Sequence, residues 1–143
     1  MTTKNDTILH RWFEEVWNKG RRDAIDEILS PHAIAHGLSD ADGNEVRGAE
    51  AFKLFYDGFH EAFPDIQVIV EDTVAEGKKL VARCKVKATH TGKGIGLTPT
   101  DSSVEFNGLC MVTVENGKIL ESWNSFDFMT MYQQLGAISL LVK

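Results

Sequence analysis

The sequence has little cysteine and proline, and it has no long run of apolar residues. Its 143 residues include two cysteines and three prolines. Cys84 and Cys110 form no CxxC pair, and two cysteines cannot build the disulfide framework of a small secreted protein. Both lie among apolar residues of predicted strands, so we expect two buried thiols in a reducing cytoplasm.

Two further absences restrict the surroundings and the partners of the protein. No stretch approaches the roughly 20 apolar residues of a membrane helix, and MTTKNDTILHRWFEEVW lacks the apolar core of a signal peptide. We expect a cytoplasmic protein with no membrane contact. A basic excess is also absent, since 15 Lys and Arg face 21 Asp and Glu, a formal net charge of −6. Such a chain repels phosphate backbones, which argues against nucleic acid as a partner.

Common catalytic motifs are missing as well. TGKGIG contains glycines but lacks the spacing of a nucleotide-binding loop, and nothing supports a Ser–His–Asp triad. His36, His90 and Asp127 could together supply the two-histidine, one-carboxylate set of some metal sites. No HxH or HExxH spacing supports that alternative, so we expect neither a metal nor an organic cofactor.

What is present indicates one domain, residues 1–143, of the α+β class. Asn5 or Asp6 is expected to cap a first helix that ends near Gly20. Apolar residues at helical spacing predict further helices. These predicted helices cover 23–29, 49–63, which Pro64 ends, and 128–135.

Alternating apolar residues predict a meander of strands after the helices. Asn116 and Gly117 suit a type I′ turn between the last two strands. Helices followed by a meander favour a curved antiparallel sheet that encloses a pocket. Leu109 and Met111 add apolar surface to the other sheet face, which a homodimer would cover. The predicted strands are 33–37, 65–77, 80–92, 104–114 and 119–127.

Several segments together resemble the SnoaL-like polyketide cyclases of the NTF2-like superfamily. They include RGAEAFKLFYDGFHEAFPD, VEDTVAEGKKLVARCKVKATHTG and VENGKILESWNSFDFMTMYQQLG. The resemblance implies a cone or barrel with a deep pocket, usually dimeric, and ring closure by intramolecular aldol condensation without a cofactor. It also implies an acid–base role for Asp127 with His90 nearby. One loop departs from the family pattern, because Pro99, Thr100, Asp101 and Ser102 replace PTG and a basic residue.

Asp127 has two competing interpretations. It stands where a strand gives way to a helix, and Asp is a preferred N-cap. A carboxylate that accepts helix amide bonds has a lowered pKa and is a weaker base, whereas one in an apolar pocket has a raised pKa. The first would be a structural residue and the second a general acid–base group. Hydrogen bonds from the amides of Met129 or Thr130 to its carboxylate oxygens would weaken the acid–base role, and oxygens that point towards His90 across an apolar cavity would strengthen it.

The other candidate site residues line the expected pocket. His90 continues the buried face of its strand, either as a core histidine or as a donor to a developing enolate oxygen. His36 is expected at the pocket mouth. Phe59 and Phe106 are expected in the wall, and strand parity adds Trp123, while Asn107 and Asn124 should face outwards unless a bulge intervenes.

These residues leave three functions open. The first is a cyclase, isomerase or lyase that acts on a small apolar carbonyl compound or polyketide-like ligand. Asp127 would be the base, and His90 would hydrogen-bond its carboxylate or stabilise the enolate. The second is a carrier or sensor that binds the same kind of ligand without turnover. The third is hydration or epoxide hydrolysis, for which the sequence offers few of the polar groups needed to position a water.

Overall fold

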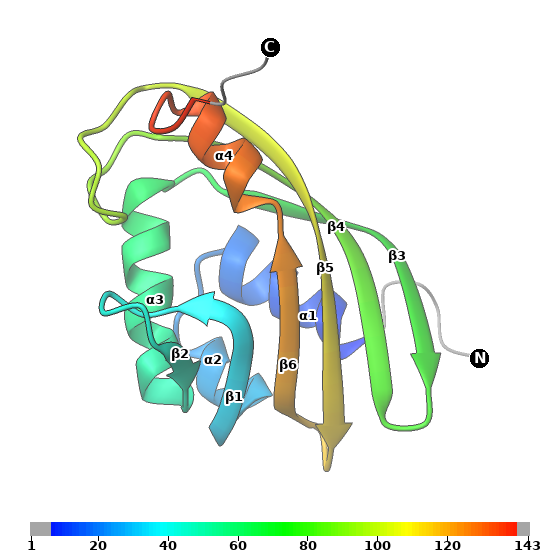
Figure 1. Cartoon of the computed structure of the whole chain (residues 1–143). Helices are drawn as coiled ribbons and strands as arrows, with labels where there is room; N and C mark the ends of the chain where they lie inside the picture. Colours follow the sequence, from blue (N-terminus) through cyan, green and yellow to red (C-terminus); the bar gives the residue numbers. More distant parts are fainter. Residues whose placement is uncertain (1–6, 140–143) are drawn as a thin grey trace.

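The computed structural model describes residues 7–139, which form one six-stranded sheet curved around a set of helices (Figure 1). The strand order is β2-β1-β6-β5-β4-β3. Neighbouring strands are antiparallel except β1 and β6, which run parallel. The strands are β1 (Leu29–Ser39), β2 (Glu45–Arg47), β3 (Gln67–Glu76), β4 (Lys79–Thr89), β5 (Ser103–Glu115) and β6 (Lys118–Phe126). The helices are α1 (Ile8–Arg11), η1 (Trp12–Asn18), α2 (Ala24–Ile28), α3 (Ala49–Ala62) and α4 (Phe128–Gln134).

The α+β class predicted from the sequence is confirmed, with two corrections to the sheet. It is mixed rather than antiparallel, because the short strand expected at 33–37 extends over Leu29–Ser39 and lies parallel to β6. A parallel pair needs a long connection, and the whole chain between β1 and β6 supplies one. The sheet is also open, since β2 and β3 remain at its two edges.

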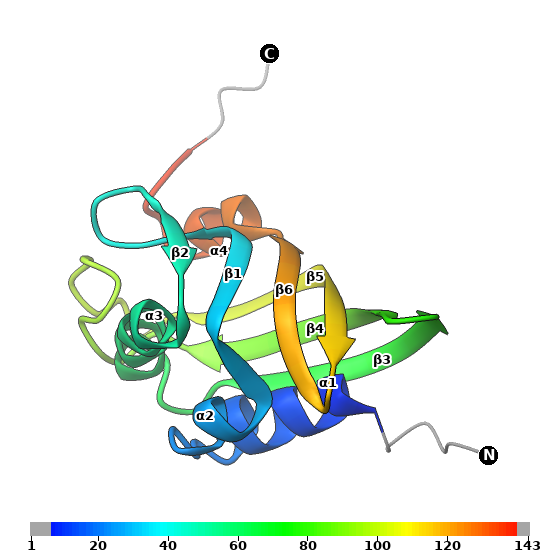
Figure 2. The same cartoon turned by 90° about the horizontal axis from the view of Figure 1, so that it is seen from below.

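The N-terminal helices and α3 lie on the concave face of the sheet, as Figure 2 shows from below. Thr7 caps the first helix by accepting a hydrogen bond from the His10 amide; the expected caps Asn5 and Asp6 lie outside the described residues. The core between helices and sheet includes fully buried residues from almost every element. Among them are Leu9, Val16, Ile25, Ile28, Phe63, Val112, Ile119 and Met131.

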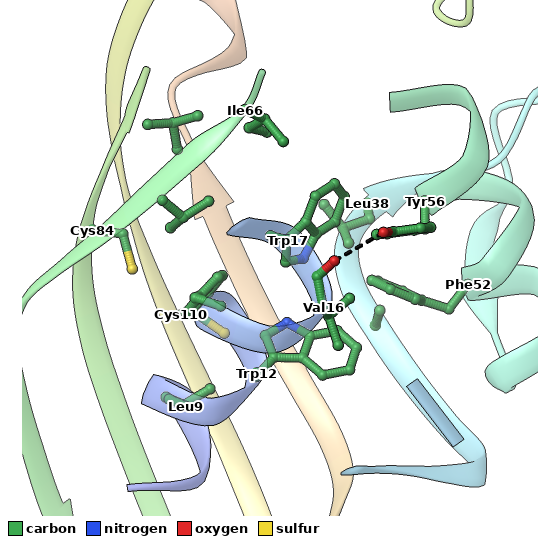
Figure 3. Close-up of a cluster of buried hydrophobic side chains, with 14 of the residues drawn as sticks. Leu9, Trp12, Val16, Trp17, Leu38, Phe52, Tyr56, Ile66, Cys84 and Cys110 are labelled. Carbon is green, nitrogen blue, oxygen red and sulfur yellow. Dashed lines mark hydrogen bonds between the residues drawn. The ribbon is translucent and has the colours of Figure 1, made fainter. Parts of the chain in front are cut away.

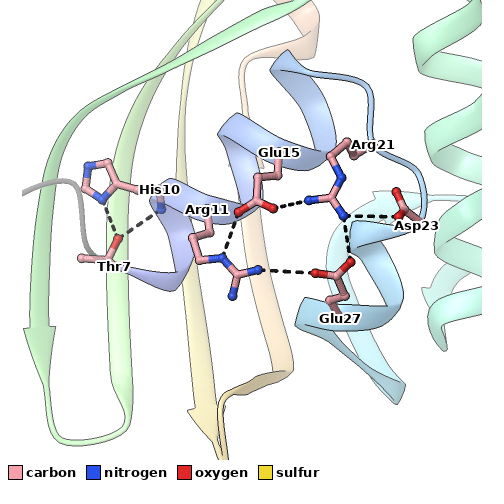
Figure 4. A network of polar contacts seen from close by, with 7 residues as sticks. All are labelled: Thr7, His10, Arg11, Glu15, Arg21, Asp23 and Glu27. Atoms are coloured by element: carbon pink, nitrogen blue, oxygen red, sulfur yellow. Dashed lines mark hydrogen bonds and ion pairs between the residues drawn. The ribbon is translucent and has the colours of Figure 1, made fainter.

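The first helix changes to a π-helix at Trp12 that ends at Asn18, so the Val16 carbonyl lies in the last turn, where helix carbonyls lack an intrahelical partner. The hydroxyl of Tyr56 in α3 donates a hydrogen bond of 2.8 Å to the Val16 carbonyl. On the surface, Arg11 and Arg21 join Glu15 to Glu27 and so connect η1 with α2 (Figure 4). These pairs are exposed and contribute little to stability, so the buried bond from Tyr56 is the more important link.

Two amide side chains hold helices against strand backbones. Asn18, at the end of η1, accepts a 2.6 Å hydrogen bond from the Val68 amide and donates a 2.9 Å bond to the Val68 carbonyl. Gln134 forms the same two-bond pairing with the backbone of Glu105. In both places the amide group replaces the neighbouring strand that the backbone lacks.

We expect Asn18→Ala to lower the free energy of unfolding by about 1–3 kcal/mol, because it leaves partly buried backbone groups of Val68 unpaired. Gln134→Ala is the matched control, since its exposed partner at Glu105 can bind water instead. Its expected cost is only about 0.5–1.5 kcal/mol. Denaturant unfolding measures both, and equal costs would contradict this account of Asn18.

The turn between β5 and β6 confirms the predicted type I′ geometry. Asn116 and Gly117 have φ values of 53° and 77°, the positive values that such a turn requires. Both cysteines are free and buried, as expected. Within residues 7–139, no helix has the length and apolar character needed to span a membrane.

Candidate functional site

An apolar cavity of about 70 Å³ lies between the helices and the concave face of the sheet. Figure 3 shows part of its wall, with Trp12 and Trp17 of η1 facing Phe52 of α3 and Cys110 of β5. Phe59 and Phe106, which the sequence predicted for the pocket, both line it. Other lining residues are Leu9, Phe13, Ala35, Leu38, Phe55, Ile66, Val68, Val86, Val112, Phe126 and Phe128.

The composition of the cavity wall indicates the polarity of the ligand that it favours. Almost all of the lining side chains are aliphatic or aromatic, so the cavity favours an apolar molecule. Pockets for drug-sized ligands are several times larger, about 300–1,000 Å³. The cavity therefore suits a small molecule, and a polycyclic ligand would require the aromatic wall to move.

The polar residues of the cavity are Ser122 and Asn124 of β6, and the sequence reasoning missed both. The cause is a β-bulge. Ile119 pairs with Val114, but Glu121 pairs with Thr113, so Leu120 is an extra residue that shifts the alternation by one position. Every later residue of β6 consequently faces the side opposite to that expected from Ile119.

Trp123 is the main correction that follows from this bulge. It faces the outer side of the sheet instead of lining the cavity. There it stacks on His36, with ring centroids 5.4 Å apart, and Lys79 lies 4.3 Å above its ring. Asn124, by contrast, faces inwards and donates hydrogen bonds to the His36 carbonyl and the Ser122 hydroxyl.

His36 also lies on the outer face, within β1, rather than at a pocket mouth. Its Nδ1 contacts Glu45 and its Nε2 contacts Glu121, each at 2.5 Å. The hydrogen bonds to Glu121 and then Glu45 raise the pKa of His36 above its ordinary value. The two glutamates therefore favour the protonated form of His36, which links β1 to β2 and β6. The homodimer expected on this face, where Leu109 is 51% exposed, stays a prediction.

The raised pKa of His36 gives a pH prediction. A histidine whose pKa is higher in the folded state stabilises the fold at pH values below its unfolded pKa, about 6.5. That contribution is lost as the pH rises through the folded pKa. We expect the free energy of unfolding to fall over this window and the slope to flatten in Glu121→Gln. An unchanged slope in that variant would contradict the role of the ion pair.

Cys110 also lines the cavity, but burial keeps its thiol in the unreactive protonated form. Burial raises the pKa of the Cys110 thiol to about 12, and that of Cys84 to the same value. A thiol is nucleophilic only as the thiolate. Both cysteines therefore act as small apolar residues at neutral pH.

Asp127 is exposed and caps α4. Its Oδ1 accepts a 3.0 Å hydrogen bond from the Thr130 amide, and its Oδ2 accepts a 2.6 Å bond from the Thr130 hydroxyl. These two bonds lower the pKa of Asp127. The carboxylate is not part of the cavity wall, although Phe126 and Phe128 on either side of it are. This geometry satisfies the capping interpretation and makes Asp127 a weaker base.

His90 is fully buried at the end of β4, as its strand parity predicted. Its Nδ1 lies 3.2 Å from the Thr100 amide and 3.1 Å from the Thr100 hydroxyl. Its Nε2 has no hydrogen-bond partner among residues 7–139. The Phe63 ring packs against both His90 and Phe59, with centroid distances of 5.4 and 5.5 Å, and of these three residues only Phe59 lines the cavity.

The structure does not bring the predicted site residues into one cluster. Over residues 7–139, no hydrogen bond joins His90 to Asp127, and His36 lies on the opposite face of the sheet. Nor does this part of the chain hold a group of three or more His, Cys, Asp or Glu side chains arranged to bind a metal. What the concave side offers is an apolar cavity. The exposed Asp127 carboxylate lies outside its wall, between two residues that line it, and the buried His90 imidazole is not part of the wall either.

Comparison with known proteins identifies the family of this chain and proteins similar to it in sequence and fold. The model of the SnoaL-like polyketide cyclase family matches residues 7–135. The aklanonic acid methyl ester cyclase of Streptomyces peucetius is 26% identical over an alignment of 142 positions that covers 95% of this chain and 92% of that protein. The structure of IdmH from Streptomyces antibioticus is 30% identical with a TM-score of 0.77, over 90% of this chain and 96% of that one. A SnoaL-like structure from Jannaschia sp. CCS1 reaches a TM-score of 0.79 at 24% identity, over 95% and 94% of the two chains.

Proposed function

The chain belongs to the SnoaL-like polyketide cyclase family, and from this premise we propose that it binds a small apolar carbonyl compound and cyclises or isomerises it by acid–base chemistry without a cofactor. The observation that carries the proposal is the apolar cavity whose wall includes both neighbours of Asp127. In this proposal an enclosed ligand packs its carbon skeleton against the aromatic rings and extends one end past Phe126 and Phe128 to the Asp127 carboxylate.

The proposed reaction begins with proton removal beside the carbonyl. The Asp127 carboxylate takes a proton from the α-carbon, and the electron pair of that C–H bond forms a C=C bond as the carbonyl oxygen becomes an enolate. The enolate carbon then attacks a second carbonyl carbon of the same molecule and forms the ring. The resulting alkoxide takes the proton back from Asp127, so the step is balanced without any co-reactant.

The cavity contributes orientation to this reaction. Intramolecular ring closure is limited by how often the two carbon centres meet, and close apolar walls reduce the alternatives that a flexible ligand explores. The lowered pKa of Asp127 keeps it ionised at neutral pH and limits its strength as a base. We therefore expect a rate enhancement that owes as much to ligand folding as to proton transfer.

A second candidate function is ligand binding without turnover. The observation that favours it is that both carboxylate oxygens of Asp127 are already engaged by Thr130. A residue devoted to capping α4 would leave the cavity as a binding site for a carrier or sensor. The cavity and its apolar selectivity are the same in both cases.

Deuterium exchange of a model ketone distinguishes these two candidates. Acetophenone is a small apolar ketone, and its methyl protons exchange with D2O through the enolate. The enzyme proposal expects the protein to accelerate this exchange above the buffer rate, measured by proton NMR. Binding of acetophenone without acceleration would instead support the carrier or sensor.

A further inference from the structure

The buried imidazole of His90 is held by the loop that follows β4. This loop, residues 91–101, leaves the sheet at His90 and returns to it beside Ser102. The His90 amide donates a 3.0 Å hydrogen bond to the Ser102 carbonyl, and the Asp101 amide donates a 2.9 Å bond to the His90 carbonyl. The base of the loop is thereby fixed to the backbone of the histidine itself.

The tip of the loop is fixed to α3 by a close backbone contact. A Cβ atom on Gly94 would lie 1.7 Å from the Gly58 carbonyl oxygen, and one on Gly58 would lie 2.7 Å from the Gly94 oxygen. Side chains at these positions would separate the two segments, which lie side by side in both Figure 1 and Figure 2. The loop is therefore held at its base by His90 and at its tip by α3, which fixes its residues near His90.

Two donors of this loop reach Nδ1 of His90. The Thr100 amide donates to it at 3.2 Å. The Thr100 hydroxyl oxygen already accepts the Ser102 amide at 3.2 Å, so its hydrogen is free to point to Nδ1, 3.1 Å away. A ring nitrogen that accepts hydrogen bonds carries no proton, and in a neutral imidazole the proton then sits on the other nitrogen.

The backbone next to Thr100 suits this arrangement. Asp101 has a φ of 58°, in the left-handed region that glycine adopts freely and Asp tolerates. Asp101 therefore adopts a turn conformation that glycine more often provides. The turn directs the Thr100 amide and hydroxyl towards the histidine.

We infer that Thr100 is a positioning residue that fixes His90 as its Nε2–H tautomer, which makes His90 a hydrogen-bond donor to a ligand oxygen and prevents it from acting as a proton acceptor. The donation to a ligand oxygen rests on the proposed function. The tautomer rests on the hydrogen bonds to Nδ1 alone. The buried Nε2–H lacks a partner within residues 7–139, and an unpaired buried donor gains from meeting an acceptor.

The ligand class follows from this donor. A carbonyl oxygen is an acceptor, and an enolate oxygen is a stronger one because it is charged. A ligand that displaces the Phe63 and Phe59 rings enough to bring its carbonyl to Nε2 satisfies the buried donor. A hydrocarbon of the same shape cannot, so the site should prefer ketones or esters over hydrocarbons.

The first experiment tests the tautomer without a ligand. Nitrogen-15 NMR of histidine-labelled protein at pH 7.5 is expected to show a one-bond proton coupling at Nε2 of His90 and none at Nδ1, with the signal assigned by its loss in His90→Gln. Thr100→Val should move the Nδ1 shift towards that of a less hydrogen-bonded nitrogen, and Thr100→Ser should restore it. A proton on Nδ1, or a shift that Thr100→Val leaves unchanged, would overturn the role of Thr100.

The second experiment tests the donor with two probes of similar shape, acetophenone and ethylbenzene. The wild type is expected to prefer acetophenone, and His90→Phe should reduce that preference about threefold to tenfold, the worth of one hydrogen bond. A general loss of packing in His90→Phe weakens both probes and cancels in the ratio. An unchanged ratio would overturn the donor role while the enolate proposal stands. If the wild type binds neither probe, the proposed function and the donor role both fail, and NMR still decides the tautomer.

Discussion

Asp127→Asn is expected to abolish most of the acceleration of acetophenone exchange, by about 10²-fold to 10⁴-fold, the usual contribution of a general base. Asparagine has a similar size but cannot take up the proton. The variant should keep its melting temperature, because asparagine caps helices as well as aspartate does. It should also keep its affinity for acetophenone, since the apolar lining of the cavity is unchanged.

Two further variants serve as controls for Asp127→Asn. Asp127→Ala removes both the base and the cap, so it should lose exchange and stability together. Thr130→Val removes the hydroxyl that donates to Oδ2, which raises the pKa of Asp127 towards its ordinary value. Exchange that persists in Asp127→Asn at the wild-type rate would assign Asp127 to capping alone and would favour a binding function.

Phe52→Ala is expected to lower the free energy of unfolding by about 3–5 kcal/mol, the usual cost of removing a buried phenylalanine ring. Phe52 is 4% exposed and lies with its ring 5.1 Å from that of Trp12 and 6.3 Å from that of Trp17. The loss is a large fraction of the total stability of a domain, about 5–15 kcal/mol. Urea unfolding measures it directly.

Leu54→Ala is the matched control in the same helix. Leu54 is 73% exposed, so its removal should change the free energy of unfolding by no more than about 0.5 kcal/mol. Because Phe52 also lines the cavity, Phe52→Ala should enlarge it, and benzene should partly restore the melting temperature. A cost for Phe52→Ala as small as that for Leu54→Ala would mean that the wall is not packed as described.

Much of the fold was predictable because local patterns determine it. The apolar positions of 49–63 recur at helical spacing, Pro64 ends the helix, and the structure has α3 over Ala49–Ala62. The alternation around Cys84 identified the buried face of β4, and it extended correctly to His90. In each case the signal lies within one segment and needs no knowledge of its neighbours.

The errors came from relations between segments. One bulged residue, Leu120, reversed the faces of Trp123 and Asn124, and no feature of ILESWNSF marks a bulge. The parallel pairing of β1 with β6 depends on residues 87 positions apart, as His36 and Trp123 illustrate. Sequence periodicity carries no information on either relation, so the polar side of the cavity could not be located in advance.

The sequence indicated two possible roles for Asp127, helix cap and general base, and the structure shows the hydrogen bonds of the cap. The Thr130 amide and hydroxyl bind the two oxygens and lower the pKa of Asp127. The role of Thr100 at His90 was missed, because a contact between residues ten positions apart across a loop leaves no periodic signal. Only the departure of Pro99–Ser102 from the family pattern pointed to that loop.

We expect the ligand to bind in the apolar cavity on the helix-covered face of the sheet. Intermolecular nuclear Overhauser effects between bound acetophenone and assigned aromatic side chains locate it. Contacts are expected from the probe to Phe59, Phe106 and Phe128, which line the cavity. Contacts confined to Trp123 and Leu109 would place the ligand on the outer face and contradict this expectation.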